Sequence, residues 1–290
     1  MPRKDSPPKR KPAPSAKAAA QAWQQHRLAA PDPSFSLAAV DPGAKPFSSG
    51  DKAGDQRHVD QLARELDELQ NLLYADRRYK MLVVLQGLDT SGKDGTLRVV
   101  FGRMSPLGVR TVAWKAPSEA ERARDFLWRI HREVPVSGEV VAFNRSHYED
   151  VLVPVVEGMI DAEETQRRYA HINDFERLLA QTGTVVLKFM LHISKDEQRK
   201  RLQDRLDDPA KRYKFQRQDL QVREKWDSYQ HAYQQAVAAT ATPWAPWTIV
   251  PSDSKTHRNL MIALAMREAL LRLRLRYPDD DPSLASLKVK

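Results

Sequence analysis

KMLVVLQGLDTSGKDG, residues 80–95, is the stretch that decides the fold. Its first seven residues form a largely apolar run, which is typical of a strand buried in a parallel sheet. Gly87, Gly92 and Lys93 then follow at the spacing of the phosphate-binding motif G-x-x-x-x-G-K. We therefore predict a strand, a phosphate-binding loop and a helix in direct succession.

The loop between this strand and this helix has the composition needed to hold a phosphate. Glycines let backbone amides converge on an anion, and the helix N-terminus adds its partial positive charge. Lys93 supplies a mobile positive charge, so we predict that it is catalytic. The predicted phosphate- and nucleotide-binding residues of the loop are Gly87, Thr90, Ser91, Gly92 and Gly95. The alternative is a glycine-rich turn with only a structural role.

The loop departs from the usual pattern directly after the lysine. Asp94 stands where a Ser or Thr normally provides a hydroxyl ligand for Mg²⁺. Asp89 lies inside the loop, where a carboxylate beside phosphates would be repelled unless a cation bridged them. We therefore predict that Asp89 is catalytic and coordinates Mg²⁺, with Mn²⁺ as a substitute metal. A helix-capping role is the alternative for this residue.

A second group of polar residues follows the expected strand at 139–143. Asn144 stands where many enzymes with this motif carry an aspartate associated with Mg²⁺, and we predict that it contacts phosphate or nucleotide. Arg145 comes next, at the edge of the sheet where open α/β sheets bind their ligands, so we predict a catalytic phosphate clamp. Glu149 and Asp150 are predicted to act as further metal ligands in place of the missing acid.

Two basic regions flank the predicted cleft. Lys115 follows the expected second strand and Arg129 lies in the next helix, and both are predicted to contact phosphate. Residues 195–217 are rich in Lys and Arg, and an Asp-Pro pair interrupts their helical pattern. We predict a mobile lid here, with Lys211 and Lys214 among the phosphate- or nucleotide-binding residues. A solvated basic face is the alternative.

Apolar runs and amphipathic patterns alternate along the rest of the chain. Strands are expected at 80–86, 109–114, 139–143, 184–192 and 248–250, and a long last helix at about 256–276. Repeated strand–helix units predict an α/β fold, a three-layer α/β/α sandwich whose parallel sheet has about five strands. The predicted organisation is a disordered basic tail at 1–28, an extended arm at 29–56, a phosphate-binding domain at 57–276 with its lid at about 195–217, and a flexible tail at 277–290.

Composition narrows the classes of function. The 290 residues include 47 Lys and Arg against 38 Asp and Glu, so the formal charge of +9 indicates an anionic partner. The absence of cysteine excludes disulfides, thiolate metal sites and cysteine nucleophiles. We see no apolar run long enough to span a membrane and no secretory signal, so we expect a cytoplasmic protein without a membrane partner.

The ordered set of motifs resembles the polyphosphate kinase 2 family. The segments that carry the resemblance are GLDTSGKDGT (87–96), KAPS (115–118), DFLWRIH (125–131), FNRSHYEDVLV (143–153), RLDDPAKRYKF (205–215) and WTIVPSD (247–253). The resemblance implies a P-loop kinase fold similar to thymidylate kinase, with a helical lid. It also implies Mg²⁺-dependent transfer of phosphate between inorganic polyphosphate and nucleotides, in either direction. Carried onto matching positions, it assigns catalytic roles to Asp89, Lys93, Arg145 and Arg205.

Within that family, FNRSHYEDV is similar to the class whose members phosphorylate both AMP and ADP, giving ATP, with GMP and GDP as further candidate acceptors. The ADP-specific members usually read FDRSWY, with Asp where this chain has Asn144. The resemblance also implies a homo-oligomer, a dimer or a tetramer. Two other readings stay open: a nucleoside monophosphate kinase that uses ATP as donor, and a non-enzymatic protein that binds nucleic acid or polyphosphate. We find no helix-turn-helix, zinc-finger or RNA-binding signature and expect no nucleic-acid partner.

Overall fold

A computed structural model of the chain describes residues 16–279, 281–283 and 287–289. In this part of the chain a six-stranded sheet has the order β1-β6-β5-β2-β4-β3. Its strands are β1 (Arg27–Leu28), β2 (Lys80–Gln86), β3 (Val109–Ala113), β4 (Val140–Asn144), β5 (Thr184–His192) and β6 (Trp247–Pro251). All neighbouring strands from β6 to β3 are parallel, whereas β1 pairs with β6 in the antiparallel sense.

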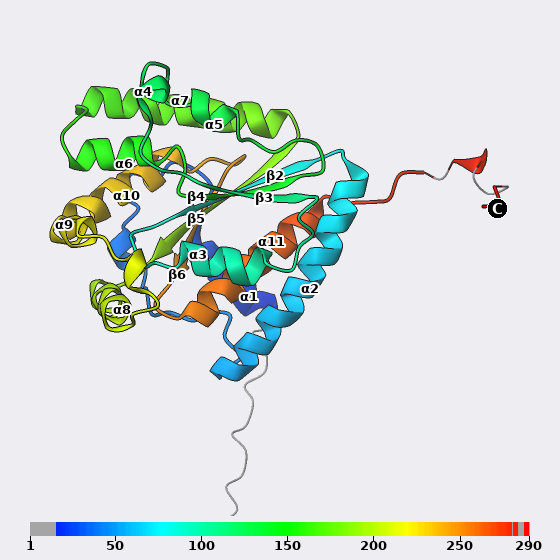
Figure 1. Ribbon diagram of the computed structural model, residues 1–290, viewed down its shortest axis with the longest axis horizontal. Helices are drawn as coiled ribbons and strands as arrows, with labels where there is room; N and C mark the ends of the chain where they lie inside the picture. Colours follow the sequence, from blue (N-terminus) through cyan, green and yellow to red (C-terminus); the bar gives the residue numbers. More distant parts are fainter. Residues whose placement is uncertain (1–15, 280, 284–286, 290) are drawn as a thin grey trace, which may run out of the picture.

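Helices follow each of the five parallel strands (Figure 1). The helices of the described chain, including α1 and α2, which precede the parallel strands, are α1 (Ala16–His26), α2 (Lys52–Asp76), α3 (Lys93–Thr96), α4 (Glu119–Arg122), α5 (Trp128–His131), α6 (Glu149–Val156), α7 (Ala162–Gln181), α8 (Lys195–Asp207), α9 (Gln218–Glu224), α10 (Trp226–Thr240) and α11 (Lys255–Arg272). Two 3-10 helices are η1 (Leu37–Ala39) and η3 (Arg212–Lys214), and η2 (Leu97–Phe101) is a π-helical turn.

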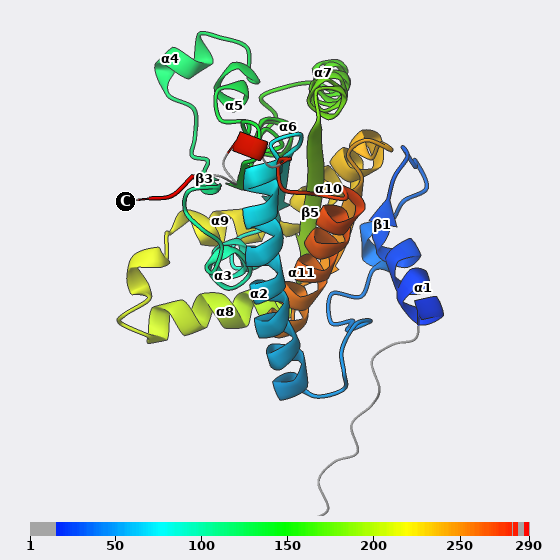
Figure 2. The ribbon, with the colours of Figure 1, turned by 90° about the vertical axis from the view of Figure 1, so that its right-hand side faces the viewer.

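The sheet has a separate hydrophobic core on each face, which makes the molecule a three-layer α/β/α sandwich. Successive residues of β2 point to opposite faces, so Leu82 and Val84 join one core while Met81 and Val83 join the other. The first core is covered by α6, α7 and α10, and the second by α2, η2 and α11 (Figures 1 and 2). The predicted fold class is therefore confirmed.

Two helices that border the carboxyl edge of the sheet begin directly after a strand. The hydroxyl of Ser194 accepts a hydrogen bond from the amide of Glu197 at the start of α8, and the hydroxyl of Ser254 accepts one from the amide of His257 at the start of α11. These N-caps satisfy amides that have no partner inside the helix. The short connections bring the first turns of α8 and α11 to the edge where β2 also ends.

The N-terminal region differs from the prediction. Residues 1–28 were expected to be disordered, but residues 16–26 form α1 and residues 27–28 add β1 to the sheet, so the strand count is six and not five. Trp23 packs on Phe47 at a centroid separation of 4.5 Å, and this contact holds α1 against the arm. Residues 1–15 of the predicted tail, and residues 280, 284–286 and 290 of the predicted C-terminal tail, lie outside the described residues.

The arm that follows is attached at several points. The amide of Leu37 donates to Gln234 of α10, and the amide of Phe47 donates to the ring of His257 in α11. The carbonyl of Pro42 accepts from the amide of Asp253. Residues 29–51 thus run from one helical layer to the other before α2 begins at Lys52, five residues earlier than the predicted domain boundary.

No helix in the described ranges is both long enough and apolar enough to cross a lipid bilayer.

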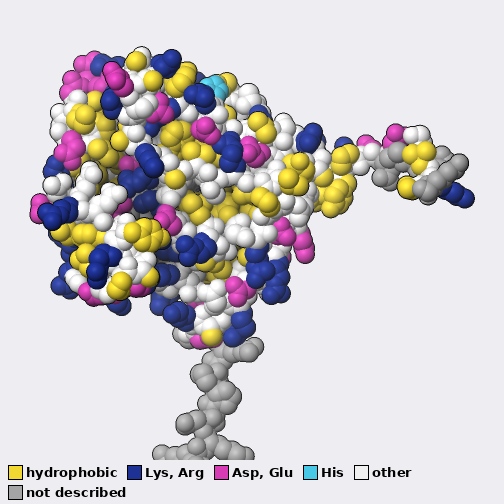
Figure 3. All heavy atoms as spheres, in the orientation of Figure 1, with side chains coloured by type: hydrophobic (Ala, Val, Ile, Leu, Met, Phe, Trp, Pro, Cys, Tyr) yellow, Lys and Arg dark blue, Asp and Glu magenta, His cyan; other side chains and the backbone are white. Residues whose placement is uncertain are grey.

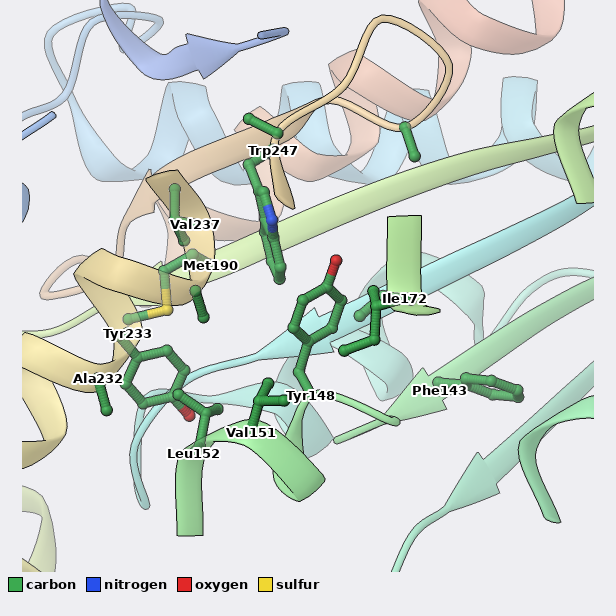
Figure 4. Close-up of a cluster of buried hydrophobic side chains, with 14 of the residues drawn as sticks. Phe143, Tyr148, Val151, Leu152, Ile172, Met190, Ala232, Tyr233, Val237 and Trp247 are labelled. Atoms are coloured by element: carbon green, nitrogen blue, oxygen red, sulfur yellow. The ribbon is translucent and has the colours of Figure 1, made fainter. Parts of the chain in front are cut away.

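A buried ion pair lies inside the first core. The ammonium of Lys188 on β5 donates to Glu176 of α7 at 2.6 Å, to the hydroxyl of Tyr148 at 2.8 Å and to the carbonyl of Thr240 at 2.7 Å. All three of its donors are therefore used, and both charged side chains are fully buried. In Figure 4, Tyr148 lies beside Trp247 with its hydroxyl pointing away from Val151. The network joins α7, α10 and the segment after β4.

Removal of the Lys188 side chain alone should therefore destabilise the fold. We expect Lys188→Met to lower the free energy of unfolding by about 3–5 kcal/mol, because Glu176 would remain buried without a counter-charge. The double variant Lys188→Met/Glu176→Gln should recover much of this loss, since no uncompensated charge remains. Urea denaturation followed by circular dichroism measures both. Equal losses in the single and double variants would contradict the explanation.

Candidate active site

An open cleft of about 2380 Å³ lies at the carboxyl edge of the parallel strands. Its floor is the loop at residues 87–95, and the ends of β3 and β4 contribute Ala113 and Asn144. The α8–α9 segment lines another side, and Figure 3 shows Lys and Arg side chains gathered around this lobe. Open α/β sheets bind ligands at this edge.

The loop backbone adopts conformations that favour glycine. Gly87 and Gly92 have φ values of 150° and 109°, and Thr90 has a φ of 65°. A β-branched residue in this left-handed region is strained, and such strain concentrates at functional sites. Within the described chain, the buried hydroxyls of Thr90 and Ser91 have no hydrogen-bond partner. A loop with unpaired hydroxyls beside a cationic side chain is suited to an oxyanion.

Lys93 lies at the start of α3 and is folded back onto the loop. Its ammonium donates to the carbonyl of Gly87 at 2.6 Å and to that of Leu88 at 3.2 Å. Burial, followed by the nearby positive charge of Arg145, lowers the pKa of Lys93 to about 8, while Asp89 opposes the shift. The charge of this lysine is thus held in place by carbonyl dipoles and is sensitive to what the loop binds.

Arg145 forms the other side of the loop site. It follows β4 with a φ of 66°, and its guanidinium donates to Asp89 at 2.6 Å and to Glu149 at 2.8 Å. Glu149 also accepts from the side-chain amide of Gln86 at 3.1 Å. The carboxylate of Glu149, followed by that of Asp89, raises the pKa of Arg145, so this side chain stays charged. Arg145 therefore brings two of the predicted site carboxylates together.

The three predicted metal ligands have different partners in the structure. Asp89 and Glu149 both pair with Arg145. Asp150 turns instead to Arg129, which donates to it at 3.1 Å and to the carbonyl of Lys115 at 2.9 Å. In the described part of the chain, no group of three or more His, Cys, Asp or Glu side chains is arranged to hold a metal ion. Asp89 and Glu149 share Arg145, whereas Asp150 pairs with Arg129, and the binding of Mg²⁺ by these three residues remains a prediction.

Arg129 and Lys115 both line the cleft, but in different ways. Arg129 is buried, and its guanidinium lies 5.3 Å from the ring centre of Trp114, so it supports the segment after β3. Lys115 is exposed, and its side chain is available to an anion in the cleft. Phosphate contact by either residue remains a prediction.

Asp94 and Asn144 face each other across the loop. The amide of Asn144 donates to the Asp94 carboxylate at 2.7 Å. In the usual arrangement a hydroxyl follows the lysine and a carboxylate ends the neighbouring strand. Here the carboxylate is on the loop and the neutral group is on the strand. Asp94 is thus a site carboxylate that the sequence prediction did not include.

The predicted lid residues line the same cleft as the loop. The segment is interrupted after α8 at Asp208, as predicted, and continues through η3 to α9. Arg205 donates weakly to the carbonyl of Lys214 at 3.4 Å, and Lys211 pairs with Asp208 at 2.6 Å. Arg205, Lys211 and Lys214 all contribute to the lining.

Two further arginines contact the loop, and the sequence analysis does not predict either contact. Arg201 of α8 donates to the carbonyl of Thr90 at 2.9 Å, and Arg258 of α11 donates to that of Ser91 at 3.0 Å. Both are buried beneath the loop. No local pattern marks these residues; the only sequence signal is their place in the first two turns of helices that follow strands.

A glycine-rich loop after a parallel strand, a buried lysine at the next helix and an arginine after the neighbouring strand define a P-loop kinase-like α/β protein. The model of the polyphosphate kinase 2 family matches residues 49–275. The chain therefore belongs to the polyphosphate kinase 2 family.

Known relatives span nearly the whole chain. An AMP/ADP-polyphosphate phosphotransferase from Meiothermus ruber is 49% identical over 89% of this chain and 96% of its own length. An ADP-polyphosphate phosphotransferase from Rhodopseudomonas palustris is 36% identical over 84% of this chain and 90% of its own. The crystal structure of polyphosphate kinase 2 from Arthrobacter aurescens TC1 has a TM-score of 0.85 and 42% identity, and it covers 94% of each chain.

The pKa of Lys93 predicts how pH affects anion binding. The ammonium is charged below about pH 8 and loses its charge above it, so affinity for tripolyphosphate should fall as pH rises through 8. The fall should approach tenfold per pH unit, because one proton is then taken up on binding (~1.4 kcal/mol per unit). Isothermal titration calorimetry between pH 6.5 and 9.5 measures it. The matched variant Lys93→Met should bind weakly with no inflection near pH 8; an inflection in the variant would assign it to another group.

Proposed function

We propose that this protein transfers the terminal phosphoryl group of inorganic polyphosphate to AMP and to ADP, in a reversible reaction that yields ATP. The observation that carries the proposal is the loop of residues 87–95, with Lys93 and Arg145 on its two sides, in a chain of the polyphosphate kinase 2 family. The relative from Meiothermus ruber, which matches over most of both chains, carries both AMP and ADP in its name. That name supports the broad acceptor range.

The residues of the cleft would act through position and charge. The phosphoryl group in transfer carries negative charge on its oxygens, so cationic side chains placed around it lower the barrier. Lys93 is within reach of the loop interior, Arg145 enters from β4, and Arg205 approaches from the opposite lobe. No covalent intermediate on the protein is needed, because the two substrates meet in the cleft.

We also propose that Mg²⁺, or Mn²⁺ in its place, is required. The metal would neutralise phosphate charge and orient the oxygens. Mg²⁺ is usually held by one or two carboxylates together with substrate phosphates, so a preassembled cluster is not required. Asp89 and Asp94 are carboxylates on the loop itself, and both line the cleft.

The lobe formed by α8, η3 and α9 fits the role of a lid. It brings Arg205, Lys211 and Lys214 to the side of the cleft facing the loop. Closure would place these cations around the phosphates and exclude water from the reaction.

We propose further that the chain forms a dimer or a tetramer. Large apolar side chains are exposed at Leu107, Val136 and Met159, and association would remove such surface from water. Light scattering coupled to size-exclusion chromatography measures the mass in solution.

The first experiment determines which phosphate donor and which nucleotide acceptor the protein uses. Purified protein with Mg²⁺ and long-chain polyphosphate is given AMP or ADP, and the products are resolved by chromatography. We expect ATP from ADP, and ADP followed by ATP from AMP, with no product when EDTA is added. Product from ADP alone would restrict the acceptor range. Transfer only when ATP replaces polyphosphate would make the protein a nucleoside monophosphate kinase.

Replacement of Lys93 tests the assignment of the loop. Lys93→Ala should lower kcat/KM by about 10²–10³-fold, the usual effect of removing one group that stabilises transition-state charge. The fold should survive, because its carbonyl partners lie beside the open cleft. Lys52→Ala is the matched control, since Lys52 is exposed at the start of α2 and does not line the cleft. Full activity in Lys93→Ala would rule out the assignment.

A further inference from the structure

The carbonyls of the phosphate-binding loop accept hydrogen bonds from Lys93 and from side chains of α8 and α11. Five consecutive carbonyls, from Gly87 to Ser91, each accept a side-chain hydrogen bond. The donors are Lys93 to Gly87 and Leu88, Gln198 to Asp89, Arg201 to Thr90 and Ser91, and Arg258 to Ser91. With its carbonyls fixed in this way, the loop cannot turn its backbone without breaking these bonds.

Arg258 differs from the other donors in its charge environment. Its side chain is 2% exposed, and its partners are the carbonyl of Ser91 at 3.0 Å and the amide oxygen of Asn259 at 2.9 Å. Arg201, by contrast, also pairs with Glu197 at 2.8 Å. Among the described residues no carboxylate forms an ion pair with Arg258. Burial, followed by the charge of Arg201, lowers the pKa of Arg258 to about 9. A buried charge without a counter-charge is unfavourable.

Two glycines of the loop leave the space that Arg258 occupies. A Cβ atom at Gly92 would lie 1.6 Å from Nη1 of Arg258, and one at Gly95 would lie 3.1 Å from Nη2. The guanidinium therefore lies directly against the backbone where the loop enters α3. The two glycines thus leave room for the Arg258 guanidinium on the side of the loop that faces α11, in addition to their effect on the loop conformation.

We propose that Arg258 is a positioning residue for the phosphate-binding loop, and that a phosphate bound on the opposite side of the loop backbone supplies its missing counter-charge. The inference rests on the proposed role of the loop in binding phosphate. In the free protein the unpaired charge of Arg258 lowers stability. In the bound protein the same charge attracts the phosphate across the loop backbone that separates them. Arg258 and the phosphate therefore stabilise each other without contact.

A purely structural role for Arg258 makes the opposite prediction. If its hydrogen bonds mainly hold the loop, removal of Arg258 destabilises the free protein. If its charge mainly serves the anion, removal leaves the free protein as stable or more stable. The acceptors would keep partners in either case, because Ser91 still receives Arg201 at 3.4 Å and Asn259 still receives the hydroxyl of Thr96 at 3.2 Å.

The test compares Arg258→Met with the wild type, with and without tripolyphosphate. We expect an unchanged or raised melting temperature in the free variant, a smaller rise on adding tripolyphosphate, and a Kd about tenfold weaker by calorimetry. With polyphosphate as substrate, KM should rise more than kcat falls. A lower melting temperature in the free variant together with an unchanged Kd would overturn the inference.

Two further variants keep the result interpretable. Arg258→Lys retains the charge but not the planar set of donors, so its Kd for tripolyphosphate should be within about threefold of the wild-type Kd. A Kd about tenfold weaker than that of the wild type would overturn the inference, even if the Met variant does not fold. Arg272→Met, at an exposed position of the same helix, is the control and should match the wild type. If the wild type binds no tripolyphosphate, the proposed function is contradicted, and so is the proposed role of Arg258.

Discussion

A loop that directs its amide groups toward an anion must find partners for its carbonyls on the other side, and this requirement organises the molecule. The loop is buried at Ser91, so water cannot serve. The partners come from α8 and α11, whose first turns reach the loop because both helices start immediately after strands. The order β6-β5-β2 places those strand ends beside the loop. The geometry of the phosphate site thus depends on the arrangement of the sheet.

Two cationic side chains of the free cleft already have partners. Lys93 is held by loop carbonyls, and Arg145 is held by Asp89 and Glu149. A bound phosphate therefore competes with partners that the cations already have. Monovalent anions gain little from such an exchange, whereas a chain of phosphates can engage several cations at once. The polyphosphate that we propose as substrate is multiply charged and can make this exchange.

The features that could be predicted from the sequence have local signals. The apolar run at 80–86 and the glycine spacing after it predicted β2 and the loop, and the Asp-Pro pair predicted the interruption after α8. Strand β1 has two residues, and its structure depends on pairing with Thr248 and Trp247. The roles of Arg201 and Arg258 come from contacts 111 and 167 residues away along the chain. Coordination of Mg²⁺ by Asp89, Glu149 and Asp150 stays a prediction. Their ion pairs could not be predicted from the sequence, because the adjacent residues Glu149 and Asp150 face different arginines.

The pairing of β1 with β6 also affects the time course of folding. Residues 27–28 are synthesised long before their partners at 247–248. The arm contacts α11 in the same way, since the amide of Phe47 donates to the ring of His257, 210 residues later in the chain. Contacts so distant in sequence close slowly, and their segments stay exposed in the meantime. Strand β1 must therefore stay unpaired until β6 has been made.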